Sequence, residues 1–256
     1  MHATAPTGEP VVELRSLTKR FGEHVAVRDL SLQVARGEIL ALLGPNGAGK
    51  TTTIRMLMGI LSPSSGTATV GGHDCFADRA EVMRKVGYLP DEPMFYEHLR
   101  GGEIARFCGA MRGMPDAAVV ARTDELAERL QFADALDEYA VNYSMGMRKK
   151  LALACAMLHD PDVLVLDEPT NGLDPMVTRT LLALVRELAA NGTAIFYSTH
   201  LLEQAERLCH RVAILHRGGL AALGTPDELR SQLAPGGSLE DVFFQVARED
   251  GAEAAE

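Results

Sequence analysis

The feature that most constrains the fold of this chain is the stretch Gly44-Pro45-Asn46-Gly47-Ala48-Gly49-Lys50-Thr51. It fits the phosphate-binding loop pattern G-x-x-x-x-G-K-S/T, which needs a strand before it and a helix after it. The apolar run Ile39–Leu43 has the length of a buried strand, and Ile54, Leu57 and Met58 follow at helical spacing. The motif therefore lies at a strand-to-helix turn and predicts an α/β core.

The residue types of this loop suit a bound nucleoside triphosphate. Glycines let successive backbone N–H groups point inward and form a nest for phosphate oxygens, and the helix N-terminus behind them adds a positive dipole. The Lys50 side chain is expected to reach the outer phosphates, and the Thr51 hydroxyl to ligate Mg²⁺. The residues of this stretch that we expect to bind nucleotide are Gly44, Pro45, Asn46, Gly47, Ala48, Gly49, Lys50, Thr51 and Thr52.

Length and charge limit the classes of protein to which the sequence can belong. The chain has 256 residues, enough for one large or two small domains, and its net charge of −10 gives no overall attraction to nucleic acid or anionic membranes. No apolar run approaches the ~20 residues of a membrane-spanning helix. Residues 1–8 lack a basic segment and an apolar segment, so we expect no secretory signal. The scattered cysteines predict free thiols in a reducing cytosol.

The chain divides into strand-rich and helix-rich parts. Alternating residues in Val11–Arg15, Val25–Val34 and Thr67–Val70 predict a small antiparallel β layer beside the loop strand. From Arg79 to His159 the pattern turns helical and is bracketed by Pro90 and Pro161. We interpret this block as a helical subdomain inserted into the α/β core.

The core resumes after this block. The apolar run Val163–Leu166 is typical of a parallel strand that is covered on both faces, and a helix is expected over Pro175–Ala190. A strand over Thr193–Ser198, a helix from Leu201 to Cys209 and a strand over Arg211–Leu215 follow. Thr225-Pro226-Asp227-Glu228 is a capping box that opens another helix.

Two carboxylates follow the strand that ends at Leu166. Ligands of open α/β sheets bind beyond the carboxyl ends of the strands, so Asp167 and Glu168 are expected to face the phosphate loop. Asp167 would hold Mg²⁺, directly or through water, and Glu168 would act as general base on the attacking water. An acidic loop without this role is the alternative.

The ordered set of motifs resembles the ATP-binding subunit of an ATP-binding cassette (ABC) transporter over roughly residues 11–246. It comprises Gly44–Thr51, Tyr143–Arg148, Leu164–Glu168, Asn171–Asp174 and Thr199–His200. Three further stretches, Gly87-Tyr88-Leu89-Pro90, the Ser-x-Gly-Met motif and Ser238–Phe243, resemble the ATPases of ABC-2 type permeases, a group that includes many drug exporters.

The resemblance implies an α/β P-loop NTPase (RecA-like) core with an antiparallel β subdomain and an inserted α-helical subdomain. We expect an ATP-binding domain over residues 11–246. Along the chain, residues 1–90 and 160–235 are assigned to the core with the β subdomain, residues 91–159 to the helical subdomain, and residues 236–256 to a C-terminal extension.

The resemblance also assigns further site residues. Phe21 takes the place of the aromatic that stacks on adenine; an ordinary core aromatic is the alternative. Ser144 and Gly146 match the signature motif, which opens a helix expected from Met147 to Leu158 and directs its N-terminus at the γ-phosphate bound by the opposite protomer. Ser144 can be an N-cap at the same time.

Two more positions are carried over in the same way. Asp174 matches an aspartate that crosses the dimer interface, and the alternative is that it only caps the helix at Pro175. His200 matches the histidine that hydrogen-bonds the γ-phosphate and Glu168.

The sequence departs from the family pattern at two places. Asp91 stands where the family has a glutamine that contacts Mg²⁺ and water and links to the permease. A carboxylate binds Mg²⁺ well, but it is shorter and charged, and a solvated loop acid is the alternative. Met145 and Met147 replace a glycine and a glutamine of the commonest signature, while the Ser-x-Gly frame remains.

We therefore expect the Mg²⁺-dependent ATPase subunit of an exporter or importer, on the cytoplasmic face of the cell membrane. It would form a head-to-tail homodimer or heterodimer around two ATP molecules and drive an integral-membrane permease that is a separate chain, with no nucleic-acid partner. The contact is expected around Asp91–Phe107, with Pro93–Tyr96 as a candidate patch, although helix packing would also explain that run. Two hypotheses compete with this one: an ABC protein that acts on ribosomes or DNA, and a nucleotide-binding module that switches without turnover. The transported substrate and the direction of transport belong to the permease and are not written in this sequence.

Overall fold

A computed structural model describes residues 8–253 of the chain, with side chains over residues 8–246. The stretch for which we expect no secretory signal lies outside the described residues, except for Gly8. Within the described part, the strands are β1 Pro10–Phe21, β2 His24–Ala35, β3 Ile39–Leu43, β4 Ser65–Val70, β5 His73–Asp74, β6 Val86–Leu89, β7 Val163–Asp167, β8 Ala194–Thr199, β9 Arg211–His216 and β10 Gly219–Gly224.

The helices of the described part begin with α1, which follows the phosphate loop directly. They are α1 Lys50–Leu57, α2 Arg79–Lys85, α3 Gly101–Ala110, α4 Asp116–Arg129, α5 Met145–Met157, α6 Pro175–Ala190, α7 Leu202–Leu208, α8 Pro226–Leu233 and α9 Leu239–Glu253, with the short 3₁₀ turns η1 Ala133–Ala135 and η2 Ala140–Asn142. None of the helices within residues 8–253 is long and apolar enough to cross a lipid bilayer.

The larger sheet places the phosphate-loop strand in its interior. Its order is β10-β9-β3-β8-β7-β6, with parallel pairing from β9 to β6 and β10 antiparallel at one edge. Because the carboxyl ends of parallel strands share one edge, the loops after β3, β7 and β8 meet there. This edge carries the candidate site.

Both faces of this sheet are buried, and β3 shows how. Ile39, Ala41 and Leu43 belong to one core cluster, while Leu40 and Leu42 belong to the other. Successive side chains of a strand point to opposite faces, so a strand with a layer on each side must be apolar throughout. The continuous apolar runs of β3 and β7 are explained by this position, and the parallel strand expected at Val163–Leu166 is confirmed.

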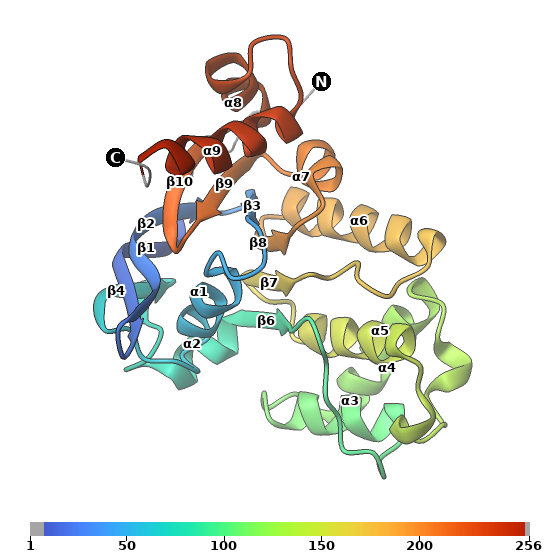
Figure 1. The fold of residues 1–256 in the computed structure, drawn as a ribbon. Helices are drawn as coiled ribbons and strands as arrows, with labels where there is room; N and C mark the ends of the chain where they lie inside the picture. The colour runs from blue at the N-terminus through green and yellow to red at the C-terminus, as the bar shows by residue number, and fades with distance from the viewer. Residues whose placement is uncertain (1–7, 254–256) are drawn as a thin grey trace.

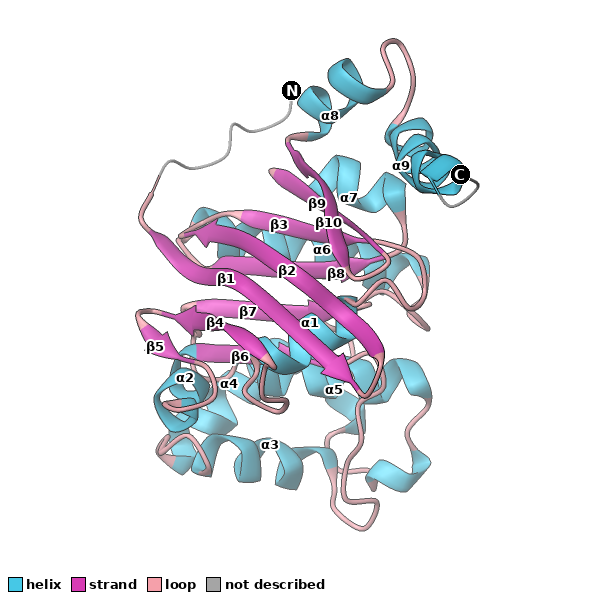
Figure 2. Ribbon diagram, turned by 60° about the vertical axis from the view of Figure 1, so that its left-hand side comes forward, coloured by secondary structure: helices cyan, strands magenta, loops and turns pink. Residues whose placement is uncertain are grey.

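The second sheet has the antiparallel order β2-β1-β4-β5, which confirms the expected β layer. Figure 2 shows its long strands β1 and β2 crossing in front of the larger sheet, with α1 beside them. Residues of this sheet, α1 and one face of β3, β7 and β8 form one core. The phosphate loop is therefore held between two sheets.

The expected helical block lies on the other side of the molecule. Helices α3, α4 and α5 pack against one another and stand apart from the second sheet (Figure 1). The expectation of a helical pattern from about Arg79 to His159 is wrong at Val86–Leu89, which form β6 at the edge of the larger sheet. This strand is short and contains Gly87, so it has weak local strand preference and is stabilised by pairing with β7.

The C-terminal part contains elements that the sequence patterns did not predict. Strand β10 extends the sheet beyond β9, and α9 forms within the expected extension and packs against α7 and α8 (Figure 1). The helix predicted at Pro175–Ala190 is confirmed at both ends, and the capping box at Thr225 and Glu228 is confirmed by its two hydrogen bonds, of 3.2 and 2.8 Å.

His159, which follows α5 in the chain, makes the stability of the folded protein depend on pH. Arg112 Nε donates to His159 Nε2 at 3.3 Å. Burial, together with the positive charge of Arg112, lowers the pKa of His159 from 6.5 to about 4. The unfolded chain therefore takes up this proton at a higher pH than the folded protein, so stability is fully present above about 6.5 and is lost as the pH falls towards about 4.

We expect the free energy of unfolding to fall by about 1–2 kcal/mol across this window, a value reduced because the ring is partly exposed. Denaturant unfolding at a series of pH values measures it. His159→Gln should flatten this part of the profile, whereas His98→Gln, at an exposed histidine, should not. Equal slopes for wild type and His159→Gln would exclude this titration.

Candidate nucleotide site

A cavity of about 340 Å³ lies beside the loop that joins β3 to α1. It brings together the loop, the end of β7 and the hairpin between β1 and β2, which are far apart in the sequence. The residues that line it are Phe21, His24, Ala26, Pro45, Asn46, Gly47, Gly49, Lys50, Thr51, Thr52, Asp91, Asp167 and Glu168. Gly44 and Ala48 belong to the same loop and support it from behind.

The conformation of the loop depends on glycine. Gly47 and Gly49 have φ of 82° and 103°, in the left-handed region that other residues rarely adopt. A Cβ on Gly49 would also lie 2.6 Å from the carbonyl oxygen of Ala26. The backbone can therefore curl only with glycine at these positions, and the N–H groups of the helix N-terminus are left open to an anion.

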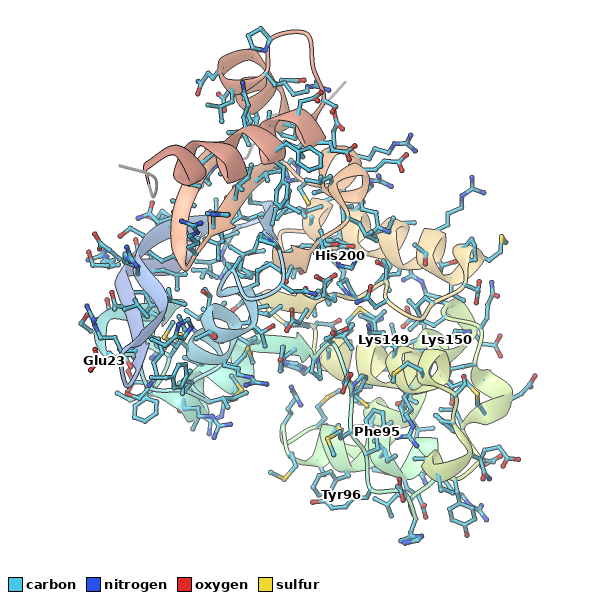
Figure 3. The ribbon with its side chains drawn as sticks, viewed as in Figure 1. Glu23, Phe95, Tyr96, Lys149, Lys150 and His200 are labelled. Carbon is cyan, nitrogen blue, oxygen red and sulfur yellow. The ribbon has the colours of Figure 1, made fainter. Side chains whose placement is uncertain are left out.

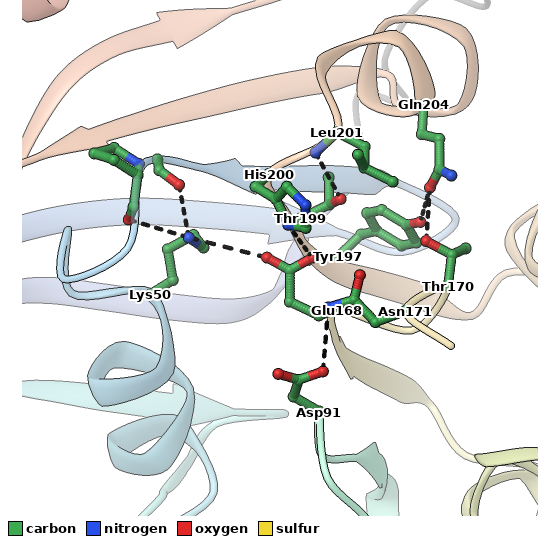
Figure 4. A network of polar contacts seen from close by, with 12 residues as sticks. Lys50, Asp91, Glu168, Thr170, Asn171, Tyr197, Thr199, His200, Leu201 and Gln204 are labelled. Atoms are coloured by element: carbon green, nitrogen blue, oxygen red, sulfur yellow. Dashed lines mark hydrogen bonds and ion pairs between the residues drawn. The ribbon is translucent and has the colours of Figure 1, made fainter. Parts of the chain in front are cut away.

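Lys50 joins the phosphate loop to Glu168 in the polar network of the site (Figure 4). Its Nζ donates to the carbonyls of Gly44 and Pro45, at 2.6 and 3.2 Å, and lies 4.0 Å from Glu168 Oε1. Burial lowers the pKa of this ammonium, while the carboxylates of Glu168 and Asp167 act in the opposite direction. A charge held in this way is suited to attract an anionic ligand.

Glu168 occupies the position between Lys50 and His200. Its Oε2 lies 2.9 Å from His200 Nδ1, and its side chain is 10% exposed, against 49% for His200. The backbone of Glu168 is in the left-handed region, with φ of 45°, and its N–H donates to the carbonyl of Ser198 on β8 at 3.0 Å. This backbone turn directs the carboxylate along the edge of the sheet towards the loop.

Asp167 fits a divalent cation. Burial raises its pKa, the charges of Asp91 and Glu168 raise it further, and the hydroxyls of Ser198 and Thr51 oppose them. Its Oδ1 is buried and has no hydrogen-bond partner among the described residues. A buried carboxylate oxygen in need of a partner, beside the Thr51 hydroxyl, is what a Mg²⁺ shared with phosphates would satisfy. No group of three or more acidic, histidine or cysteine side chains that could hold a metal by itself occurs in the described part of the chain.

Asp91 lines the cavity from the loop that follows β6. Its Oδ1 lies 3.3 Å from Lys149 Nζ and 3.4 Å from Asn171 Nδ2. The alternative of a merely solvated loop acid does not hold, because the carboxylate has two protein partners. Its role as a metal ligand stays a prediction.

The hairpin between β1 and β2 contributes one predicted and one missed residue. Phe21 is 50% exposed and lines the cavity, so the alternative of a core aromatic is excluded. Lys19 Nζ lies 5.3 Å from the centre of its ring. His24 lines the same cavity, and its sequence position gave no signal because the turn that brings it there is visible only in the β1–β2 pairing.

The remaining predicted residues lie outside the lining of this cavity. Ser144 Oγ caps α5 by accepting from Met147 N at 3.2 Å, so that helix begins at Met145 and not at Met147 as expected. Asp174 Oδ1 caps α6 by accepting from two backbone N–H groups at 2.9 Å. Both residues therefore cap their helices, and their roles across a dimer interface stay predictions. Gly146 stands beside Ser144 at the start of α5, where a Cβ would meet the carbonyl of Gly172 at 3.2 Å.

Two polar residues that the sequence patterns did not single out support the edge of the site. Gln204 Oε1 accepts from Tyr197 and Thr170, at 2.9 and 3.1 Å, and ties the loop after β7 to β8 (Figure 4). Lys149 is buried between α5 and the loops of the core. In the sequence it belongs to the basic run Arg148-Lys149-Lys150, which by itself is typical of a solvated face.

Comparison with known proteins agrees with this geometry. Residues 27–171 match the family described as ABC transporter. The chain is 35% identical over 243 residues to the probable multidrug ABC transporter ATP-binding protein YbhF of Escherichia coli, covering 93% of this chain and 42% of YbhF. It is 38% identical over 237 residues to the daunorubicin resistance ATP-binding protein DrrA3 of Streptomyces coeruleorubidus, covering 93% of this chain and 74% of DrrA3.

A solved ATP-binding subunit of an ABC transporter superposes with a TM-score of 0.88 at 33% identity, covering 93% of this chain and 99% of that one. The predicted α/β fold, with its P-loop core, β layer and inserted helices, is confirmed by this likeness. The chain spans about two fifths of the length of YbhF.

Proposed function

The chain belongs to the ABC transporter family, and from that premise we propose that it binds ATP with Mg²⁺, hydrolyses it and drives a separate membrane permease. The observation that carries the proposal is the position of Glu168 beside the phosphate loop. Its Oε1 lies 4.0 Å from Lys50 Nζ, and its Oε2 lies 2.9 Å from His200 Nδ1. A base between a phosphate-binding cation and a histidine suits phosphoryl transfer to water.

Each residue has a separate task in this proposal. The loop and Lys50 bind and orient the phosphates, and Phe21 offers an exposed ring on which adenine stacks. Glu168 accepts a proton from the attacking water, and His200 holds that carboxylate through Nδ1. A Mg²⁺ held by Thr51 and Asp167, with Asp91 nearby, would supply neutralisation of phosphate charge.

We propose that the site is completed by a second copy, or by a related ATP-binding subunit, arranged head to tail. The support is that Ser144 and Gly146 carry the signature motif at a helix N-terminus but do not line the cavity of their own chain. The apolar side chains of Met145 and Met176, at the starts of α5 and α6, are 50% and 62% exposed. Exposed apolar side chains beside a helix start are suited to contact another protein.

The permease contact is proposed at the loop before α3. Met94 and Tyr96 are 90% and 70% exposed, and the ring of Tyr96 packs edge-on against Phe107 at 6.3 Å between centroids. Pro93 is buried, and Phe95 packs against the core. Of the candidate patch Pro93–Tyr96, only Met94 and Tyr96 are therefore exposed for contact with a partner. Figure 3 places Phe95 and Tyr96 at the helical side of the molecule, away from β1 and β2.

We further propose that the chain acts on the cytoplasmic face of the cell membrane without a nucleic-acid partner. The domain division at residues 90/91 and 159/160 remains a proposal, supported by the mutual packing of α3, α4 and α5. The names of YbhF, which describes a probable multidrug ABC transporter, and of DrrA3, which describes daunorubicin resistance, make drug transport the first transport class to test.

Turnover as a function of protein concentration tests the proposed ATPase. With ATP and Mg²⁺, we expect the rate per molecule to rise with concentration until dimers form, and EDTA to abolish it. Light scattering on the same samples gives the oligomeric state. A rate per molecule that is flat and high in a monomeric sample would contradict the shared site, and the absence of turnover at every concentration would contradict the enzyme.

A further inference from the structure

Lys149 is a charged residue that the interior of the protein surrounds almost completely. Its side chain is 1% exposed, although it lies in a basic run on the first turns of α5. Figure 3 shows it where α5 approaches the strands of the core, beside Lys150. Burying an ammonium without compensation is strongly unfavourable, so its partners indicate why it is there.

The partners of this ammonium lie on two segments, the loop between β7 and α6 and the loop after β6. Nζ donates to the carbonyl of Glu168 at 2.7 Å, to the carbonyl of Asn171 at 3.0 Å and to Asp91 Oδ1 at 3.3 Å. Among the described residues, Asp91 supplies the carboxylate within ion-pair distance of this ammonium. A single side chain of α5 therefore connects the signature helix to the β7–α6 loop and to the loop after β6.

The bond to Glu168 has a specific consequence. The residue adopts φ of 45°, a backbone conformation that residues with a side chain rarely adopt. Its N–H is held by the carbonyl of Ser198, and its carbonyl by Lys149, so both sides of the turned residue are fixed by hydrogen bonds. Strained backbone at a functional site persists only where surrounding contacts fix it.

The contact with Lys149 also explains why residue 91 is an acid. Its carboxylate balances the buried charge of Lys149, and Asn171 Nδ2 approaches the same Oδ1 at 3.4 Å (Figure 4). The basic neighbours of Lys149 make other contacts: Arg148 Nε donates to Tyr143 and Lys150 Nζ to Gln131, both on the helical side. The charge pair is thus specific to position 149.

We propose that Lys149, with Asp91 as its counter-ion, is a positioning residue that fixes the backbone of Glu168 and couples the signature helix to it. This inference rests on the proposed ATPase function, because Glu168 is the base of that reaction. It also assigns to Asp91 a role within the protein that does not depend on a metal ligand.

The test uses the purified chain and the variants Lys149→Met, Lys149→Arg, Asp91→Asn and Lys149→Met with Asp91→Asn. Lys150→Met is the matched control, since it removes an adjacent lysine whose bond to Gln131 is exposed. Thermal unfolding is measured without nucleotide, and kcat and KM for ATP are measured with Mg²⁺.

We expect Lys149→Met to lower kcat by about 10²-fold with KM changed by less than about threefold, because positioning and not ATP binding is lost. Asp91→Asn should lower kcat less, and Lys149→Arg should retain more activity than Lys149→Met. Without nucleotide, Lys149→Met should lower Tm by about 5 °C or more, and the double variant should lose less than the sum of the two single losses. Lys150→Met should match wild type.

Additive Tm losses, or an unchanged kcat in Lys149→Met, would overturn the inference, as would a change confined to KM. If Lys149→Met does not fold, the variants Asp91→Asn and Lys149→Arg still test the inference. A charge pair that positions Glu168 requires each of these two variants to have a lower kcat than wild type at unchanged KM. Wild-type protein without turnover would contradict the proposed function, whereas the nucleotide-free coupling between positions 91 and 149 tests the pair separately.

Discussion

The Glu168→Gln variant is expected to hydrolyse ATP about 10²–10³-fold more slowly than wild type while binding ATP with an affinity within about threefold. The amide keeps the size of the side chain and can still contact His200, but it cannot accept a proton from water. Glu168 is 10% exposed at the mouth of the cavity, and its Oε2 lies 2.9 Å from His200 Nδ1. Loss of the base therefore affects the chemical step and leaves the phosphate loop intact.

Single-turnover hydrolysis measures the chemical step, and fluorescence titration with a nucleotide analogue measures binding. Glu203→Gln provides a control, because this glutamate lies on α7, is 75% exposed and pairs with Arg207 away from the cavity. Equal turnover in wild type and Glu168→Gln would assign the base to another residue. Loss of binding in the variant would show that the carboxylate holds the nucleotide, which the geometry does not predict.

Local rules explain which parts of the fold could be predicted from the sequence. The phosphate loop, the apolar strands β3 and β7, and the Asp174-Pro175 start of α6 each have a signal within a few neighbouring residues. The carboxylates at the end of β7 are predictable as facing the loop because parallel strands share one edge, and Asp167 and Glu168 do line its cavity.

The rest could not be predicted because it depends on contacts between distant segments. Strand β6 is stable through its pairing with β7, since Gly87 gives it little preference of its own. Lys149 meets Asp91 across 58 residues of sequence, and a basic run at the start of a helix gives no sign that one member turns inward. His24 reaches the cavity through the register of a hairpin.

The same limit applies to the signature motif. Ser144 and Gly146 were predicted from the resemblance, and the structure places them at the start of α5, where Ser144 caps the helix. This position explains the local need for serine but gives the pair no contact with the cavity of its own chain. Under the proposed head-to-tail arrangement, their role in ATP hydrolysis depends on a second chain.

A mixture of two inactive variants is expected to recover about a quarter of wild-type turnover, provided that the site is shared head to tail. Lys50→Met removes the charge that the phosphate loop offers, and Gly146→Asp places a negative charge where the γ-phosphate is expected. Each variant alone lacks one part in both of its sites. In a mixed dimer, the intact loop of the Gly146→Asp chain faces the intact signature of the Lys50→Met chain, so one of the two sites is complete.

Random pairing makes half of the dimers mixed, and one active site in each gives the expected quarter. The control replaces the Gly146→Asp chain with a chain that carries both substitutions, because no pairing then contains an intact loop. Recovery in the first mixture and not in the second would locate the signature of one chain at the phosphate loop of the other. If neither mixture recovers although light scattering detects dimers, the two halves of the site do not meet across the interface, and the role of Ser144 is limited to capping α5.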